Sequence, residues 1–283
     1  MKSKIETVKT LLDALPYIKK FHNDIILIKY GGSAQTSSEL KQKFAKDVAL
    51  LSLVGMKPVI VHGGGKSITN LLQELNIQTE FIDGQRVTTK EVMRIAEMVL
   101  SGEVNKDIVS LLNSQGAKAI GISGKDANFL KAVPKDKKKF GYTGVIKEIN
   151  PEIIFKMLDD GLIPVIAPIA GSNKIDEPGF NINADLAASK IAVALKARKI
   201  LFLTDTPGVL DKEKNLIQTL SIAQVEELKK DGTIVGGMVP KVDACIEALK
   251  GGVKKAHIID GRVEHSILLE ILTSSGIGTC ISL

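Results

Sequence analysis

Apolar runs and helically spaced apolar positions alternate along most of the chain. Each run is nearly continuous, which is typical of a strand that is covered on both faces, as in a parallel sheet. The runs fall at 24–30, 57–62, 163–168, 199–204 and 255–259. Helical spacing is found at 37–55, 66–76, 89–101, 151–160, 184–197, 221–230, 239–250 and 265–273. This order of strand, turn and helix predicts an α/β fold built on an open, mostly parallel sheet.

Two regions depart from that alternation. Residues 4–22 have helical spacing before the first strand, and Pro16 should kink the helix because it lacks an N–H and clashes with the preceding turn. The pattern fits a helix packed on its own domain and an arm docked on another subunit equally well. The region 119–149 predicts a short strand at 119–122 and then a β-hairpin at 130–149, with the lysine-rich segment 135–139 at its tip.

No Ser/Gly-rich linker or low-complexity segment divides the chain, so we expect one continuous fold with two lobes. The expected parts are a helix at 1–22, an N-terminal lobe at about 23–198 and a C-terminal lobe at about 199–283. With 283 residues, 44% of them hydrophobic and 25% charged, the chain has the composition of an ordinary soluble protein with a large core.

The net charge and the aromatic content indicate which classes of binding partner the protein could have. The net charge of +6 suits an anionic substrate, whereas the absence of Trp and an aromatic content of 4% argue against stacking on single-stranded nucleic acid. Cys245 and Cys280 have no metal-binding spacing, and no apolar segment approaches the length of a membrane span. We therefore expect a reduced, cytoplasmic protein without nucleic-acid or membrane partners.

Two glycine turns directly follow predicted strands, Gly31-Gly32 and Gly63-Gly64-Gly65. Such turns let backbone N–H groups approach an anion closely. One of them alone is more often structural, but two after consecutive strands predict a shared crevice at the carboxyl edge of the sheet. Neither turn is a P-loop or a dinucleotide fingerprint, and the protein-kinase motifs are absent.

Charged residues next to glycines suggest the chemistry of that crevice. Lys29 ends the first strand, Lys241 follows Gly236-Gly237 at a helix start, and Asp185 opens another helix, where it could hold both lysines in place. A lysine taken singly is usually a solvated surface residue. The glycine context points instead to phosphoryl transfer, which needs fixed positive charge on the phosphates.

These segments resemble the amino-acid kinase family and, within it, the acetylglutamate kinases, over nearly the whole chain. The matching segments are Lys29-Tyr30-Gly31-Gly32, Val61-His62-Gly63-Gly64-Gly65, Gly84-Gln85-Arg86-Val87-Thr88, Asn181-Ile182-Asn183-Ala184-Asp185, Leu203-Thr204-Asp205-Thr206-Pro207-Gly208-Val209 and Gly236-Gly237-Met238-Val239-Pro240-Lys241. The resemblance implies the amino-acid kinase fold, an αβα sandwich, and ATP-dependent phosphorylation of the γ-carboxylate of N-acetyl-L-glutamate, an early step of arginine biosynthesis.

The resemblance also implies a role for each matching residue. Lys29 and Lys241 would stabilise the transferring phosphoryl group, and Asp185 would organise them. The residues implied to bind substrate are Gly64, Gly65, Arg86 and Asn181, and those implied to bind nucleotide are Gly31, Gly32, Thr204, Asp205, Thr233 and Val235. Magnesium would be held mainly by ATP oxygens, and the four histidines form no metal cluster. No general base is required, because a carboxylate acceptor is already ionised at neutral pH.

Regulation is implied by the two ends of the chain. The N-terminal helix and the tail from His265 to Gly278 resemble features of hexameric acetylglutamate kinases that arginine inhibits. There the helix interlaces dimers into a trimer of dimers, and arginine binds beside it. The residues implied to bind arginine are Tyr17, His265, Glu270 and Gly278. The alternative interpretation of these two segments is plain helix packing.

Two other functions fit much of this pattern. A sibling kinase could act on a related acidic acceptor of the aminoadipate type; an aspartokinase fits less well, because the first glycine turn continues with Ser33 rather than Thr-Ser. A non-catalytic amino-acid sensor could keep the fold, but the joint presence of Lys29, Asp185 and Lys241 argues against it.

Overall fold

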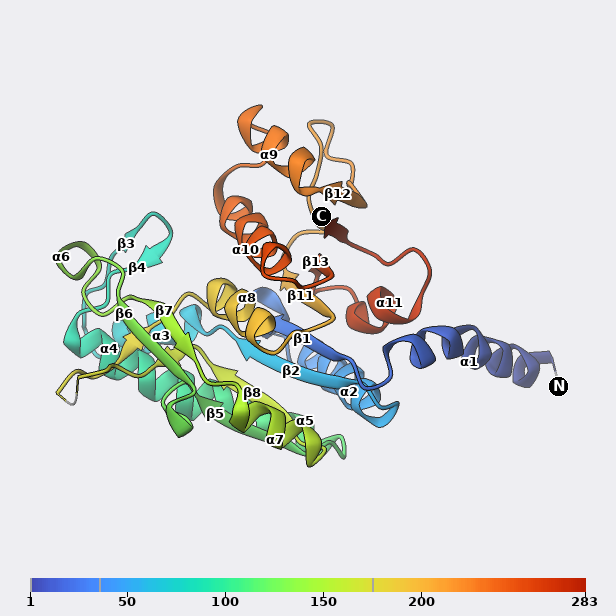
Figure 1. Cartoon of the computed structure of the whole chain (residues 1–283), viewed down its shortest axis with the longest axis horizontal. Helices are drawn as coiled ribbons and strands as arrows, with labels where there is room; N and C mark the ends of the chain where they lie inside the picture. The colour runs from blue at the N-terminus through green and yellow to red at the C-terminus, as the bar shows by residue number, and fades with distance from the viewer. Residues whose placement is uncertain (1, 36, 175) are drawn as a thin grey trace.

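The computed structural model describes residues 2–35, 37–174 and 176–283 (Figure 1). Within these ranges an eight-stranded sheet has the strand order β12-β14-β13-β11-β1-β2-β8-β5. Its strands are β1 (Ile25–Tyr30), β2 (Lys57–His62), β5 (Ala119–Ser123), β8 (Ile163–Ala167), β11 (Lys199–Thr204), β12 (Thr219–Ser221), β13 (Lys255–Asp260) and β14 (Thr279–Ser282). Neighbouring strands are parallel except β13 and β14. The predicted mostly parallel α/β sheet is confirmed.

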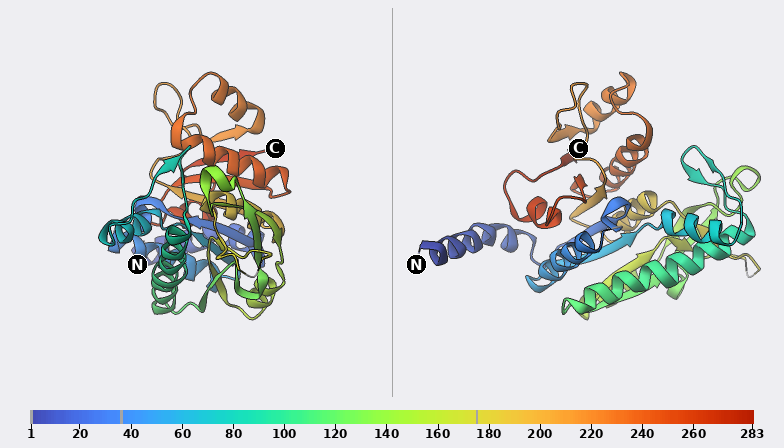
Figure 2. Two further views of the ribbon diagram at one scale, coloured as in Figure 1. Left: turned by 90° about the vertical axis from the view of Figure 1, so that its left-hand side faces the viewer. Right: turned by 180° about the vertical axis from the view of Figure 1, so that it is seen from behind.

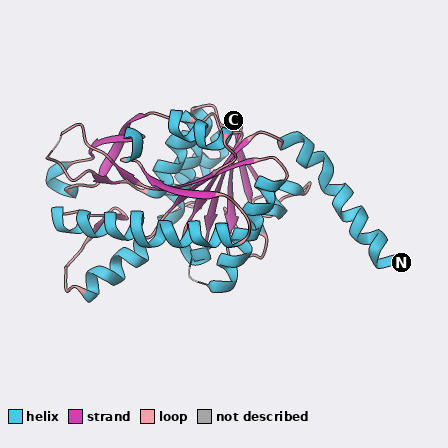
Figure 3. Cartoon of the chain, turned by 90° about the horizontal axis from the view of Figure 1, so that it is seen from below, coloured by secondary structure: helices cyan, strands magenta, loops and turns pink. Residues whose placement is uncertain are grey.

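Helices cover both faces of this sheet (Figure 3). The α-helices are α1 (Lys2–Phe21), α2 (Ser38–Leu53), α3 (Gly65–Glu74), α4 (Lys90–Glu97), α5 (Asn105–Ser114), α6 (Lys137–Phe140), α7 (Glu152–Asp159), α8 (Ala184–Ala194), α9 (Ile222–Lys230), α10 (Val239–Lys250) and α11 (Ser266–Leu272). Shorter turns are η1 (Gly32–Gln35), η3 (Asp126–Asn128) and η4 (Gly236–Met238), and η2 (Met98–Val104) is a π-helix.

The core consists of a hydrophobic layer on each face of the sheet. One layer packs α7, α8 and α10 against β1, β2, β11 and β13, and the other packs α2, α5 and α11 against the opposite face. A third cluster joins α3, α4 and η2 above the end of β8. This double coverage explains why the central strands read as continuous apolar runs.

Small two-stranded ribbons lie outside the main sheet. They pair β3 (Phe81–Ile82) with β4 (Gln85–Arg86), β6 (Leu130–Pro134) with β7 (Gly144–Ile149), and β9 (Ile169–Ala170) with β10 (Phe180–Asn181). The predicted hairpin at 130–149 corresponds to β6 and β7, and its lysine-rich tip includes the short helix α6. These ribbons bring Arg86 and Asn181 towards the carboxyl edge of β2 and β8.

The helix expected at 89–101 is longer than predicted. The helical backbone continues from α4 through η2 into α5 and ends at Ser114. The π-helical turn hydrogen-bonds one residue further along the chain than an α-helical turn, so it shifts the apolar spacing midway along the segment. The α-helical periodicity of the sequence therefore ends at this turn.

The N-terminal helix α1 projects away from the body of the protein in Figures 1 and 2. Pro16 lies inside one unbroken helix, so the expected kink does not split it. At its end, Phe21 is buried and Tyr17 packs against the layer that contains α11. In contrast, Ile5, Val8, Leu11, Leu12 and Leu15 are between 38% and 67% exposed.

Candidate active site

Two lysines and one aspartate meet between three different elements. Lys29 Nζ, from the end of β1, lies 2.9 Å from Asp185 Oδ1, and Lys241 Nζ, from the first turn of α10, lies 3.3 Å from Asp185 Oδ2. The structure thus joins the three residues that sequence analysis assigned to catalysis, although they are far apart in the chain. Two cations share one anion, so the cluster carries net positive charge.

The Asp185 carboxylate is kept ionised by its neighbours. Burial alone would raise its pKa, but the charges of Lys29 and Lys241 and their hydrogen bonds outweigh that effect and hold the pKa below its usual value. Asn183 caps α8 by accepting hydrogen bonds from the backbone N–H groups of Asp185 and Leu186. The cap fixes the first helical turn and therefore the position of the carboxylate.

The two glycine turns lie side by side, as the order of their strands predicts. β1 pairs with β2 in parallel, and the Gly63 N–H donates a 2.8 Å hydrogen bond to the Tyr30 carbonyl. A β-carbon on Gly31 would stand 2.8 Å from Lys29 Nζ, so glycine leaves room for the lysine. Gly32 has φ +68°, and a β-carbon there would collide with the Asp205 carboxylate.

A cavity of about 150 Å³ opens beside the second glycine turn. It is lined by Gly63, Gly64 and Gly65 at the start of α3, by Arg86 and by Asn181, together with apolar side chains. The N-terminus of a helix favours anions, because its N–H groups are free and its dipole is positive there. The cavity therefore suits an anionic ligand.

Arg86 is the cation of this cavity. Its guanidinium donates hydrogen bonds to Thr79, Thr69 and the Gly65 carbonyl at 2.8–3.1 Å, and it lies 4.6 Å from the centre of the Phe81 ring. Burial lowers its pKa from the usual value. Among the described residues no carboxylate forms an ion pair with Arg86, so its charge is available to a ligand. The amide of Asn181 donates a 3.3 Å hydrogen bond to Thr88.

The residues assigned to nucleotide binding occupy two places. Thr204 ends β11, and its carbonyl accepts a 2.8 Å hydrogen bond from Gly261; exposed Asp205 follows it, directly beside Gly32. Thr233 and Val235 lie on the loop between α9 and η4, and η4 leads into the helix that carries Lys241. Val235 is 63% exposed.

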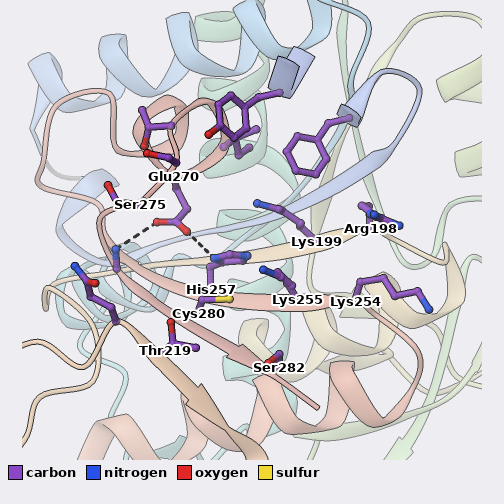
Figure 4. A pocket seen from close by; sticks show the side chains of 18 of the residues that line it. Arg198, Lys199, Thr219, Lys254, Lys255, His257, Glu270, Ser275, Cys280 and Ser282 are labelled. Atoms are coloured by element: carbon purple, nitrogen blue, oxygen red, sulfur yellow. Dashed lines mark hydrogen bonds and ion pairs between the residues drawn. The ribbon is translucent and has the colours of Figure 1, made fainter. Parts of the chain in front are cut away.

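A second cavity, of about 330 Å³, lies between the end of α1, α11 and β14 (Figure 4). Tyr17, Glu270 and Gly278 line it, as sequence analysis expected, whereas His265 does not. His265 precedes α11 and pairs with Asp47 of α2 at 2.6 Å. The geometry does not support the assignment of His265 to this group.

Sequence analysis missed His257 in the second cavity. Its Nδ1 lies 2.6 Å from Glu270 Oε1, and both side chains are buried. Burial alone would raise the pKa of the Glu270 carboxyl. The interaction with His257 and the hydrogen bonds from the backbone N–H groups of Ile277 and Gly278 outweigh burial, and the net effect is a lowered pKa. Burial also lowers the pKa of His257 and that of Lys199. The signal available in the sequence was a histidine inside an otherwise apolar strand.

Within the described ranges, no group of three or more His, Cys, Asp or Glu side chains could share a metal ion. No helix of that part of the chain is both long and apolar enough to cross a bilayer.

The fold and the paired lysines define a class of protein. A family model for the amino acid kinase family matches residues 24–260. The chain therefore belongs to the amino acid kinase family, and it is a kinase.

Individual proteins within and beyond this family are also similar to the chain. The chain is 76% identical over 283 residues, 100% of both chains, to an acetylglutamate kinase of Sulfurovum sp.. It is 69% identical to an acetylglutamate kinase of Nitratiruptor sp., over 99% of this chain and 98% of that one. Among solved structures it resembles an N-acetylglutamate synthase of Neisseria gonorrhoeae, complexed with coenzyme A and N-acetyl-glutamate. That match has a TM-score of 0.85 and 26% identity, and covers 98% of this chain and 63% of that longer chain.

Proposed function

We propose that this protein phosphorylates the γ-carboxylate of N-acetyl-L-glutamate with ATP, in arginine biosynthesis in the cytoplasm. The observation that carries the proposal is the Lys29–Asp185–Lys241 cluster, which stands beside two glycine turns and near a cavity with an available arginine. The high identity to acetylglutamate kinases supports this choice of acceptor.

The acceptor would occupy the cavity beside Arg86. Arg86 would bind the α-carboxylate, because its planar guanidinium can donate two parallel hydrogen bonds to one carboxylate. Asn181 would bind near the acetamido and carboxylate groups, and Gly64 and Gly65 would donate backbone N–H groups. The γ-carboxylate would then point towards the lysine cluster.

The reaction needs positioning and charge neutralisation rather than a base. A γ-carboxylate oxygen attacks the γ-phosphorus of ATP, the new O–P bond forms, and the bond to the β,γ-bridging oxygen breaks to release ADP. The acceptor has a usual pKa of about 4.3, so no proton must be removed at neutral pH. Lys29 and Lys241 would stabilise the charge on the transferring group, with Asp185 keeping both ammonium groups oriented.

ATP would lie on the C-terminal lobe, about 199–283, opposite an acceptor held by the N-terminal lobe, about 23–198. Gly31 and Gly32 would approach its phosphates, and Thr204, Asp205, Thr233 and Val235 would hold the rest of the nucleotide. Magnesium ions would accompany ATP and be held mainly by its phosphate oxygens.

The choice of acceptor is tested by measuring ADP release with purified protein and a panel of acids. N-acetyl-L-glutamate should give turnover, whereas N-acetyl-L-aspartate and N-acetyl-L-aminoadipate, one methylene shorter and longer, should give much less. A preference for the aminoadipate compound would instead identify a sibling kinase. Lack of turnover with all three would contradict the proposal.

We further propose that arginine inhibits the enzyme from the second cavity. The Glu270 carboxylate, held ionised by its hydrogen bonds, can receive a guanidinium, and Tyr17 can close over it. Lys199 lines the same cavity and has no carboxylate partner among the described residues, so it can receive the α-carboxylate of the amino acid (Figure 4). An effector acts through different affinity for two conformations, and arginine here would favour the one with the weaker active site.

The exposed side of α1 supports a homohexamer, a trimer of dimers. Five large apolar side chains of α1 remain exposed at helical spacing along a helix that projects from the body. A second copy of the same helix would cover them. Because the end of α1 also lines the second cavity, assembly and inhibition would be linked.

A further inference from the structure

A buried chain of hydrogen bonds lies behind the second glycine turn. His62, the last residue of β2, and Asn105, the first residue of α5, are both fully buried. Asn105 Nδ2 lies 3.1 Å from His62 Nε2 and 2.9 Å from the Val165 carbonyl, and His62 Nδ1 lies 2.9 Å from the Gly63 carbonyl.

The partners define which ring nitrogen carries the proton. The amide nitrogen of Asn105 is only a donor, so His62 Nε2 must accept. The Gly63 carbonyl is only an acceptor, so His62 Nδ1 must donate. The same burial lowers the pKa of His62 to about 4, with a small contribution from Lys106, and the ring is therefore neutral at physiological pH.

The hydrogen bond to Gly63 orients the glycine turn. The peptide that joins Gly63 to Gly64 is planar and trans, so its C=O and N–H point in opposite directions. A carbonyl held on the His62 side therefore directs the Gly64 N–H away from His62. Gln35 Nε2 also donates to the Gly63 carbonyl, at 3.4 Å.

Two neighbouring features accompany the hydrogen bonds of His62 and Asn105. Asn105 directly follows the π-helix η2, whose Leu100 and Val104 lie against Gly64. Gly121 in β5 has no side chain, and a β-carbon there would collide with the Asn105 amide. A π-helical turn within a longer helix is often found at functional sites.

We propose that His62 and Asn105 are positioning residues for phosphoryl transfer: Asn105 holds His62 as the neutral Nδ1–H tautomer, and His62 aims the Gly64 N–H into the active site. The inference rests on the proposed function, because it assumes that the Gly64 N–H contacts the acceptor or the transferring group. Neither residue touches a reacting atom.

A pair of variants with the same side-chain shape tests the role of His62. His62→Asn can place an amide N–H where Nδ1 stands, whereas His62→Leu cannot donate at all, and both lose the contact with Asn105. We expect kcat to fall by about 100-fold in His62→Leu, since a misplacement near 1 Å has this effect, and to stay within about fivefold of wild type in His62→Asn. KM for ATP should change little in either. Equal kcat values in the two folded variants would overturn the proposal.

The tautomer itself is measured in the wild-type protein, so the test does not depend on folded variants. In protein labelled with ¹⁵N-histidine, the nitrogen spectrum of His62 should show a proton on Nδ1 and none on Nε2 at pH 6–9. A proton on Nε2 would overturn the proposal. In Asn105→Asp an acceptor faces Nε2, so that nitrogen should gain a proton.

Asn113→Asp is the matched control, because Asn113 joins the same helix to the other end of β5 through Ala119. It should leave the His62 spectrum and kcat unchanged. If wild-type protein fails to phosphorylate N-acetyl-L-glutamate, the proposed function fails, and the spectrum still decides the hydrogen-bond chain independently.

Discussion

Asp185 is the shared counterion of two lysines, and the structure allows its contribution to stability to be worked out. In Asp185→Asn the side chain keeps its shape and loses its charge, which leaves the ammonium groups of Lys29 and Lys241 without their common partner. At an effective dielectric constant of about 20, each attraction at these distances is about 5–6 kcal/mol. Taking the carboxylate out of water offsets much of that gain, and breaking a buried ion pair typically costs about 3–5 kcal/mol.

We therefore expect the free energy of unfolding to fall by about 3–5 kcal/mol in Asp185→Asn, measured with urea at pH 7 and one fixed protein concentration. Asp159→Asn is the matched control, because Asp159 also pairs with a lysine, Lys57, at 3.0 Å but is 72% exposed. Exposed pairs contribute about 0–1 kcal/mol, so this variant should unfold like wild type.

The pH dependence of the free energy of unfolding gives a second measurement of the role of Asp185. Its folded-state pKa is lowered, so its stabilising contribution is present above the unfolded pKa of about 3.9 and is lost as pH falls through the folded-state pKa. The difference between wild type and Asp185→Asn should therefore persist from pH 7 down to about pH 4 and shrink below it. An Asp185→Asn protein as stable as wild type at pH 7 would refute the role of shared counterion.

Three further predictions concern the proposed roles. Lys29→Ala and Lys241→Ala should each lower kcat by about 100-fold or more, because removing a charge aimed at the transition state costs about 2.7–4 kcal/mol; near-normal turnover in a purified variant would remove that residue from the mechanism. Arg86→Lys should raise KM for acetylglutamate by about tenfold or more, since one charge-assisted hydrogen bond contributes about 1.5–3 kcal/mol, while a rise in KM for ATP instead would place Arg86 in the other subsite. Deletion of residues 1–20 should leave an active dimer that arginine no longer inhibits, as measured by light scattering and inhibition curves; a hexameric or arginine-sensitive truncated protein contradicts the proposed regulation.

The main sheet and its glycine turns could be predicted because their signals are local. A doubly covered strand is apolar throughout, and adjacent parallel strands place their carboxyl ends at one edge. This reasoning anticipated that the turns at Gly31 and Gly63 would lie together, and that Lys29 would stand at the same edge. The full length of the helix from Lys90 to Ser114 could not be predicted from the sequence. Its π-helical turn interrupts the 3.6-residue spacing of apolar positions by which an α-helix is recognised.

The second cavity shows where sequence reasoning fails. Tyr17 and Glu270 line one cavity, and the histidine that lines it with them is His257, whereas His265 lies outside it. His265 precedes α11 with a left-handed backbone (φ +56°) and pairs with Asp47 of α2, whereas Glu270 lies within α11 and contacts His257. His257 lies inside the apolar strand β13, where a polar side chain is recognised as part of a site only once its buried partner is known.

The proposed reaction can be tested by detecting its product, the acyl phosphate. Purified protein, ATP, Mg²⁺ and N-acetyl-L-glutamate are incubated with hydroxylamine, which converts an acyl phosphate into a hydroxamate that iron(III) makes visible. We expect hydroxamate in amounts equal to the ADP released, dependent on both substrates, and about 100-fold slower formation with Lys29→Ala. ADP release without hydroxamate, or no dependence on acetylglutamate, would contradict phosphorylation of its γ-carboxylate.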